Sequence, residues 1–118
     1  MATKEKKVAP ITLADPDSGE KYVLEFSRES VRFAEQRGFK IGELTDFPQT
    51  NIPALFFYAF RKNHKFVQRD KTDKMLDDLG GLTPVEIGRL AELYNQPNEA
   101  LINQEEGGRK NSRLTLEL

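Results

Sequence analysis

Few residues in this sequence are suited to acid–base or nucleophilic chemistry. There is one histidine, His64, and no cysteine, which excludes a multi-histidine metal site and any thiolate site. A catalytic serine needs a neighbouring base and a strained, exposed turn. The four serines instead fall in a turn, a predicted cap, a predicted helix and the C-terminal tail: Ser18, Ser27, Ser30 and Ser112. We therefore expect His64 to be a surface histidine at a helix end.

Carboxylates and glycine pairs also lack the surroundings that catalysis requires. The adjacent acids at 77–78 and 105–106 lie in charged runs, and no apolar pocket is indicated that would raise the pKa of a general acid. The glycine pairs at 80–81 and 107–108 lack the strand–loop–helix context of a phosphate-binding loop. We predict no catalytic, metal-binding or cofactor-binding residue and no cofactor, and expect that the protein is not an enzyme.

A basic cluster is the first candidate for a binding surface. Residues 61–74 hold six basic and two acidic side chains, a local net charge of +4. Such a cluster attracts nucleic acid or an acidic partner. It is also typical of a solvated helix face with short-range ion pairs, such as Asp70 with Lys74, and we favour that interpretation. The cluster contributes these residues to a candidate charged contact patch: Arg61, Lys62, Lys65 and Arg69.

An aromatic segment is the second candidate. A helix predicted over residues 52–63 would place one apolar stripe against the core and leave Phe57 and Tyr58 outside that stripe. Four aromatic rings within residues 56–60 are more than one core-facing stripe can hold, and aromatic residues are enriched at protein interfaces. We therefore expect a partner-binding surface formed by these side chains: Phe56, Phe57, Tyr58 and Phe60.

The elements that must position these residues begin with an N-terminal hairpin. Alternation of apolar and polar residues in 11–13 and 22–26 predicts two strands with one buried face, joined by turn-forming residues 15–20. Ser27 is suited to cap a helix that runs to about residue 37, and Gly38 is suited to end it. Residues 40–50 are interpreted as a connecting loop.

Further helices are predicted over residues 68–79, 84–94 and 97–103. Gly80 should stop the first, Thr83 and Pro84 should start the second, and Asn95 should separate the last two. A helix pair over 84–103 resembles a helix-turn-helix motif. However, residues 83–106 hold one basic side chain against five glutamates, which would repel DNA phosphates. A small DNA-binding regulator that uses the helix pair 84–103 is therefore kept as the alternative function.

Together these elements predict one α+β domain over residues 9–103, with an antiparallel hairpin packed on four to five short helices. Residues 1–8 are expected to be a flexible N-terminus, and residues 104–118 a linker and tail. Within that tail, residues 113–118 alternate and predict either a strand added to the hairpin or a disordered end. The net charge is −1 and no apolar run reaches the ~20 residues that span a bilayer, so we expect a cytoplasmic protein.

The order of several segments resembles a known family. These are YVLEFSRESV at 22–31, EQRGF at 35–39, IPALFFYAF at 52–60, HKF at 64–66 and LAELYNQPNEAL at 90–101. Across residues 20–103 the chain resembles a small family of siphophage and prophage proteins that is similar in size and organisation to tail assembly chaperones. None of the matching segments is catalytic.

The resemblance implies a function in phage tail morphogenesis. Tail assembly chaperones bind the long tape measure protein before it is enclosed, keep it soluble, and help to recruit tail tube subunits. The expected partners are therefore the tape measure protein and the major tail protein, with self-association as a further expectation and no partner membrane or nucleic acid. The expected location is the host bacterial cytoplasm, and the protein should be absent from the mature virion.

Overall fold

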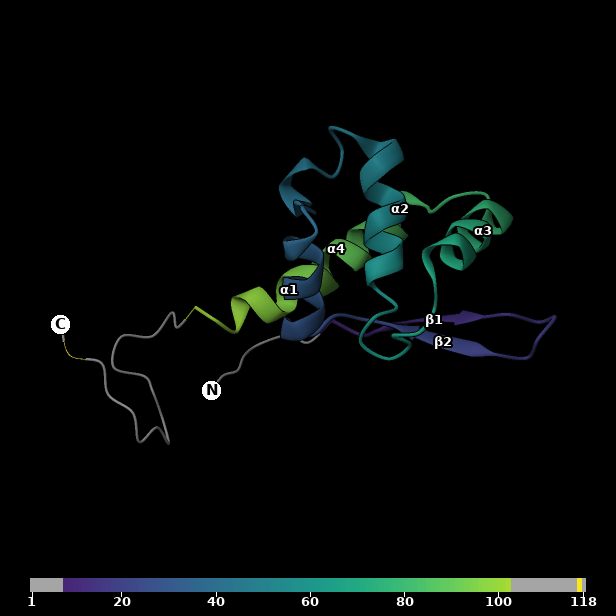
Figure 1. Cartoon of the computed structure of the whole chain (residues 1–118), viewed down its shortest axis with the longest axis horizontal. Coiled ribbons are helices and arrows are strands. Elements are labelled where there is room, and N and C mark those ends of the chain that lie inside the picture. The colour runs from purple at the N-terminus through teal and green to yellow at the C-terminus, as the bar shows by residue number, and fades with distance from the viewer. Residues whose placement is uncertain (1–7, 103–116, 118) are drawn as a thin grey trace.

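The computed structural model describes residues 8–102 and residue 117, and shows a long hairpin beside a group of helices (Figure 1). The elements in chain order are β1 Ile11–Ala14, β2 Lys21–Leu24, α1 Arg28–Gln36, the 3₁₀ helix η1 Ile41–Glu43, α2 Pro48–Tyr58, α3 Arg69–Leu79 and α4 Pro84–Glu99. The predicted α+β fold, an antiparallel hairpin with four α-helices, is confirmed. The predictions for residues 1–7 and 103–116, and thus most of the predicted C-terminal strand, lie outside the described residues.

The hairpin has one face directed at the helices. β1 and β2 are antiparallel, with Ile11 opposite Leu24 and Leu13 opposite Tyr22. Side chains alternate between the two faces of a strand, so these four residues share a face, on which Tyr22 and Leu24 are almost fully buried. The hairpin predicted from the alternation is confirmed.

Both predicted ends of α1 are confirmed. The Ser27 hydroxyl accepts a hydrogen bond from the Ser30 N–H, and the Ser30 hydroxyl accepts one from the Ser27 N–H, which forms a capping box. Gly38 has φ of 88°, in the left-handed region that favours glycine. The next residue, Phe39, folds back so that its N–H donates to the Ala34 carbonyl at 3.1 Å, and its ring is buried.

Helix α2 corrects two predicted boundaries. It starts at Pro48 rather than at residue 52, and it ends at Tyr58 rather than at residue 63. Pro48 takes the first helical position, where a missing N–H costs nothing. Asn51, within the helix, donates from its side-chain amide to the Glu43 carbonyl at 2.7 Å and so ties α2 to η1. The residues predicted as a loop thus hold η1 and the first turn of α2.

Helix α4 corrects the predicted helix pair. It runs without interruption from Pro84 to Glu99, with Pro97 inside it, so the predicted break at Asn95 and separate helix 97–103 are wrong. Leu90, Leu93 and Tyr94 are each 1% exposed and hold the helix against the core. This packing outweighs the one backbone hydrogen bond that Pro97 lacks. The described residues therefore contain no helix pair within 84–99.

The core lies where α2 meets the hairpin, α1 and α4. Tyr94 of α4 packs edge-on against Phe26, with 5.1 Å between ring centroids, and against Phe39 at 5.4 Å. Phe39 in turn contacts Tyr58 of α2 at 5.5 Å. Side-chain packing of this kind fixes the positions of helices that are distant in sequence. Within the described part of the chain, no helix is long and apolar enough to cross a membrane.

Candidate protein-binding surface

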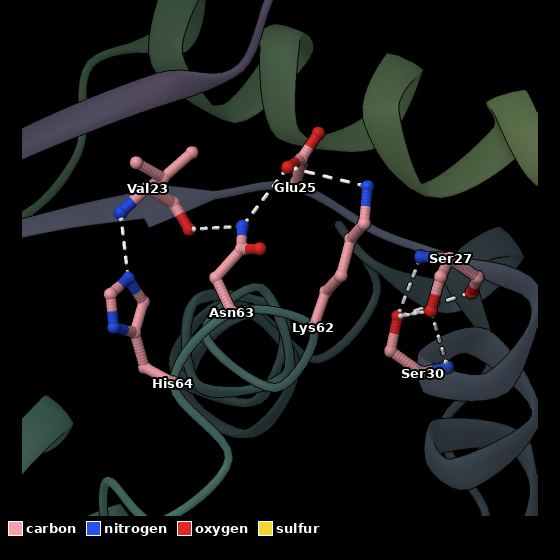
Figure 2. A network of polar contacts seen from close by, with 7 residues as sticks. All are labelled: Val23, Glu25, Ser27, Ser30, Lys62, Asn63 and His64. Carbon is pink, nitrogen blue, oxygen red and sulfur yellow. Dashed lines mark hydrogen bonds and ion pairs between the residues drawn. The ribbon is translucent and has the colours of Figure 1, made fainter.

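The outer edge of β2 is covered by the chain that follows α2. The Glu25 N–H donates to the Ala59 carbonyl at 3.1 Å, just beyond the end of β2. Farther along, the Val23 N–H donates to His64 Nε2 at 2.9 Å, and the Asn63 side-chain amide donates to the Val23 carbonyl at 3.1 Å. Figure 2 shows these contacts from residues 63 and 64 converging on the strand. Open strand edges invite pairing with other chains, and this segment, residues 59–64, closes one.

His64 is a structural hydrogen-bond acceptor. A neutral imidazole has one acceptor nitrogen, so acceptance at Nε2 assigns the proton to Nδ1. The ring is partly buried and packs edge-on against Tyr22, with centroids 5.1 Å apart. The expectation of a surface histidine at a helix end is therefore wrong. No local pattern in the sequence indicates this role, because the hydrogen-bond partner is a backbone group 41 residues away.

A carboxylate strengthens the same attachment. Glu25 Oε2 accepts from the Asn63 side-chain amide at 3.0 Å and forms an ion pair with Lys62 Nζ at 3.3 Å (Figure 2). Hydrogen bonds to charged groups are stronger than neutral ones. Three consecutive side chains, Lys62, Asn63 and His64, thus fix this segment to β2.

The fixed segment ends in a turn that presents Phe66 to solvent. The His64 N–H donates to the Phe60 carbonyl at 2.7 Å, and the Val67 N–H donates to the His64 carbonyl at 3.1 Å. Between these two bonds Phe66 is 88% exposed, the largest exposed fraction among the large hydrophobic side chains of the described residues. A large apolar side chain held in water on an anchored turn is a feature of binding surfaces.

The surroundings of Phe66 are concave and contain one lysine, Lys65, without a described carboxylate partner. An open hollow of about 570 Å³ lies beside the turn. Its lining residues are Glu20, Tyr22, Lys62, Asn63, His64, Lys65, Phe66, Val67 and Lys71. Three lysines and one glutamate line it, and no described carboxylate pairs with Lys65. We call this set the Phe66 surface.

A short polar network lies on the hairpin side of the Phe66 surface. The Tyr22 hydroxyl donates to the Glu20 carboxylate, and this bond raises the pKa of Tyr22 because it stabilises the protonated phenol. Lys71 Nζ lies 4.0 Å from Glu20 Oε1. The Tyr22 side chain raises the pKa of Lys71. Lys71 is thus paired with Glu20 on the α3 side of the hollow.

The aromatic side chains predicted to bind a partner are mostly core. Phe56, Tyr58 and Phe60 are 2%, 7% and 1% exposed, so the predicted partner-binding role is wrong for these three. Phe57 is partly buried and packs against the core. The interior holds three of the four rings and part of the fourth, because α2 and the residues that follow it are packed against neighbouring elements on several sides.

The predicted charged contact patch is largely neutralised. Arg61 pairs with Glu29 at 3.2 Å, Lys62 pairs with Glu25, and Arg69 pairs with Asp73 at 3.0 Å. Only Arg69–Asp73 is a short-range pair on a helix face, as that interpretation expects; the partners of Arg61 and Lys62 lie more than 30 residues earlier, and Lys65 has no such partner among the described residues. Lys74 pairs with Asp78 and not with the expected Asp70. The Arg61 guanidinium also stacks on the Phe33 ring at 3.7 Å.

No grouping of the described side chains offers metal chemistry. Among these residues, no cluster of three or more histidine or carboxylate side chains is placed to hold an ion. In the sequence, Phe66 stands out only as part of the matching segment HKF at 64–66. Its exposure follows from the anchored turn, which the sequence did not predict.

Fold and site together define a small α+β protein with an exposed aromatic residue on an anchored turn. The whole chain, residues 1–118, matches the family described as "Domain of unknown function (DUF5055)", and the protein belongs to that family. No curated protein and no solved structure matches the chain.

Proposed function

We propose that this protein acts by binding another protein through the Phe66 surface, and that it is a phage tail assembly chaperone whose partner is the tape measure protein. The observation that carries the proposal is the 88% exposure of Phe66 on a turn fixed at both ends. A side chain already held in its binding conformation loses little entropy on association. The turn is thus suited to binding and contributes little to the core.

The chemistry of the surface supports a helical partner with apolar and acidic side chains. Phe66 offers one large apolar contact, and Lys62, Lys65 and Lys71 surround it. An amphipathic helix can place an apolar residue against Phe66 and carboxylates against the lysines. A long tape measure protein would present such sites repeatedly, and several weak contacts along one chain raise the overall affinity.

The choice of partner rests on the resemblance across residues 20–103 to tail assembly chaperones. We propose on the same basis that the protein acts in the host bacterial cytoplasm during tail morphogenesis, is absent from the mature virion, and has tail tube subunits as further partners. The DNA-binding alternative depended on a helix pair over 84–103. Because α4 is one continuous helix, that geometric support is withdrawn.

Co-expression with the tape measure protein tests the proposal. The Phe66→Ser variant should fold normally, because its side chain contributes little to the core, and should lose most of its ability to co-purify with soluble tape measure protein. The matched control is Phe47→Ser, which changes a phenylalanine that is 62% exposed at the other end of α2. This control should bind like the wild type.

Two results would overturn the proposal. One is retention of tape measure protein by the Phe66→Ser variant at the wild-type level. The other is equal loss of binding in both variants, which would point to general surface stickiness and not to a site. Circular dichroism and urea unfolding establish that both variants are folded.

A further inference from the structure

The outer edge of β1 has no covering segment among the described residues. Val23 directs its N–H and carbonyl toward residues 63 and 64, so its cross-strand neighbour Thr12 must direct its own backbone groups away from β2. The Asp15 N–H bonds the Glu20 carbonyl, which confirms that odd-numbered residues of this strand face β2. Thr12 and Ala14 therefore present two N–H and two carbonyl groups outward, and no hydrogen bond to these groups is formed within the described structure.

β1 is short, with four residues, but its edge lacks three other features that commonly prevent strand pairing. Natural edge strands carry lysine, an internal proline or a bulge. Between Ile11 and Ala14 there is no charged residue and no proline, and the register is regular. Figure 1 shows the turn of the hairpin extending past the helices.

The edge is self-complementary in one antiparallel register. Pro10 has no N–H to donate, which disfavours a pairing that places it opposite Ala14 of another strand. In a register with Leu13 opposite Leu13, Thr12 of each copy instead lies opposite Ala14 of the other copy. All the outward N–H and carbonyl groups of these two residues are then hydrogen-bonded. The two Leu13 side chains then lie adjacent on the inner face, as cross-strand apolar pairs do.

The charges at the two ends of β1 fit the same register. Arg89 donates from Nη1 to the Ala9 carbonyl at 3.4 Å, beside the start of the strand, and has no ion-pair partner among the described carboxylates. Asp15 and Asp17 follow the end of the strand, and neither is in a described ion pair. Antiparallel pairing of two copies brings the acidic end of each strand to the basic end of the other.

We propose that β1 pairs with β1 of a second copy of this chain, antiparallel and with Leu13 opposite Leu13, to form a four-stranded sheet across a two-fold axis. Each copy gains backbone hydrogen bonds from Thr12 and Ala14 and a contact between its Asp15–Asp17 turn and Arg89 of the second copy. Leu13 and Ala14 also line a hollow of about 400 Å³, together with Met75 and Leu79 of α3 and five charged side chains, Asp15, Asp17, Lys71, Lys74 and Asp78. Leu79, which is 49% exposed, borders that hollow.

Sedimentation equilibrium of the full chain, from micromolar to millimolar concentration, tests the pairing. The wild type should form a dimer. The Thr12→Pro variant loses only an outward N–H, so its dimer dissociation constant should rise by about tenfold or more while the β1–β2 ladder stays intact. The Thr12→Val variant retains the N–H and should dimerise like the wild type.

A charge exchange tests the register and does not depend on a proline in the strand. Asp17→Arg and Arg89→Asp should each weaken the dimer by placing like charges together, and the double variant should restore it. A wild type that stays monomeric throughout, a Thr12→Pro variant that dimerises as tightly as Thr12→Val, or a double variant no tighter than either single one would overturn the proposal.

The dimer is independent of the proposed chaperone function. The Phe66 surface lies beside β2, on the opposite edge of the hairpin from the proposed dimer contact. Phe66→Ser should therefore leave the dimer intact, and Arg89→Asp should leave tape measure binding by each monomer intact.

Discussion

His64 Nε2 accepts a hydrogen bond from the backbone N–H of Val23, with 2.9 Å between the two atoms. Asn63 bonds the carbonyl of the same residue at 3.1 Å. Two side chains from the segment after α2 thus replace the third strand that β2 would otherwise need. The same contacts fix the turn that carries Phe66, so the stability of the hairpin and the shape of the candidate binding surface have a common origin.

Replacing His64 should therefore weaken the fold through Val23. The His64→Phe variant keeps an aromatic ring near Tyr22 but leaves the Val23 N–H without an acceptor. We expect the free energy of unfolding to fall by about 1–3 kcal/mol, the cost of an unsatisfied buried donor. Urea unfolding measures this loss, and faster hydrogen exchange at the Val23 amide would locate it.

His64→Gln is the matched control. Its side-chain carbonyl offers an acceptor near the position of Nε2, so it should retain more stability than His64→Phe. If the phenylalanine variant were as stable as the wild type, packing of the ring and not the hydrogen bond would be the contribution of His64.

The parts of the fold that the sequence predicted well are those determined by near neighbours. The Ser27 and Thr83 caps bond to residues three positions later, and Gly80 ends α3 through its own φ of 75°. These signals lie within one helical turn, where residue type alone restricts the backbone. The hairpin followed in the same way from alternation and turn residues.

The candidate site was predicted poorly because its contacts are long-range. Phe66 is exposed because His64 and Asn63 bind a strand about 40 residues earlier, and no local pattern indicates that. Similarly, Arg61 and Lys62 are neutralised by Glu29 and Glu25, which precede them by more than 30 residues. A count of charges along the sequence therefore overstated the basic patch.

The Phe33 ring lies between two arginines and supplies a second test of packing. Arg37 Cζ lies 3.9 Å from the ring centroid and Arg61 Cζ lies 3.7 Å from it. Arg61 Nε is buried without a hydrogen-bond partner, so the ring face is a principal contact of this guanidinium, together with its ion pair to Glu29. Phe33→Leu should lower the free energy of unfolding by about 1–2 kcal/mol, through loss of two cation–π contacts.

A double-mutant cycle separates this effect from simple loss of volume. The Arg61→Gln substitution should lower the free energy of unfolding less in the Phe33→Leu background than in the wild type, because the contact between the guanidinium and the ring is already absent in that background. Additive losses in urea unfolding would mean that the arginine and the ring do not interact energetically.

Tyr94 predicts how stability changes at alkaline pH. Burial, with further contributions from Glu35 and Tyr58, raises the pKa of Tyr94 from 10.0 to about 12. Below pH about 10 the phenol is neutral in both the folded and unfolded states. Between pH about 10 and 12 only the unfolded chain loses the proton, so the free energy of unfolding should fall by up to about 2–3 kcal/mol.

The Tyr94→Phe variant isolates the contribution of the Tyr94 hydroxyl to this loss of stability. The variant keeps the ring contacts with Phe26 and Phe39 and removes the ionisable group, so its stability should fall less steeply above pH 10 than that of the wild type. The other ionisable groups are present in both proteins, so the difference between the two slopes reports on Tyr94 and its coupling to Glu35 and Tyr58. Parallel slopes in urea unfolding across this range would show that Tyr94 is not responsible.

Substitution of Pro97 tests why α4 continues through a region in which the sequence predicted a break. Inside a helix, proline lacks the N–H that would bond the carbonyl four residues earlier, here that of Leu93. Because Leu93 and Tyr94 are anchored in the core, the helix continues through Pro97 despite the missing hydrogen bond. An alanine at position 97 would restore that bond. Pro97→Ala should raise the free energy of unfolding by about 1–3 kcal/mol, and Pro97→Gly should gain about 1 kcal/mol less. Loss of stability in the alanine variant would instead mean that the partly buried proline ring packs productively against its neighbours, and that packing rather than tolerance retains it in the helix.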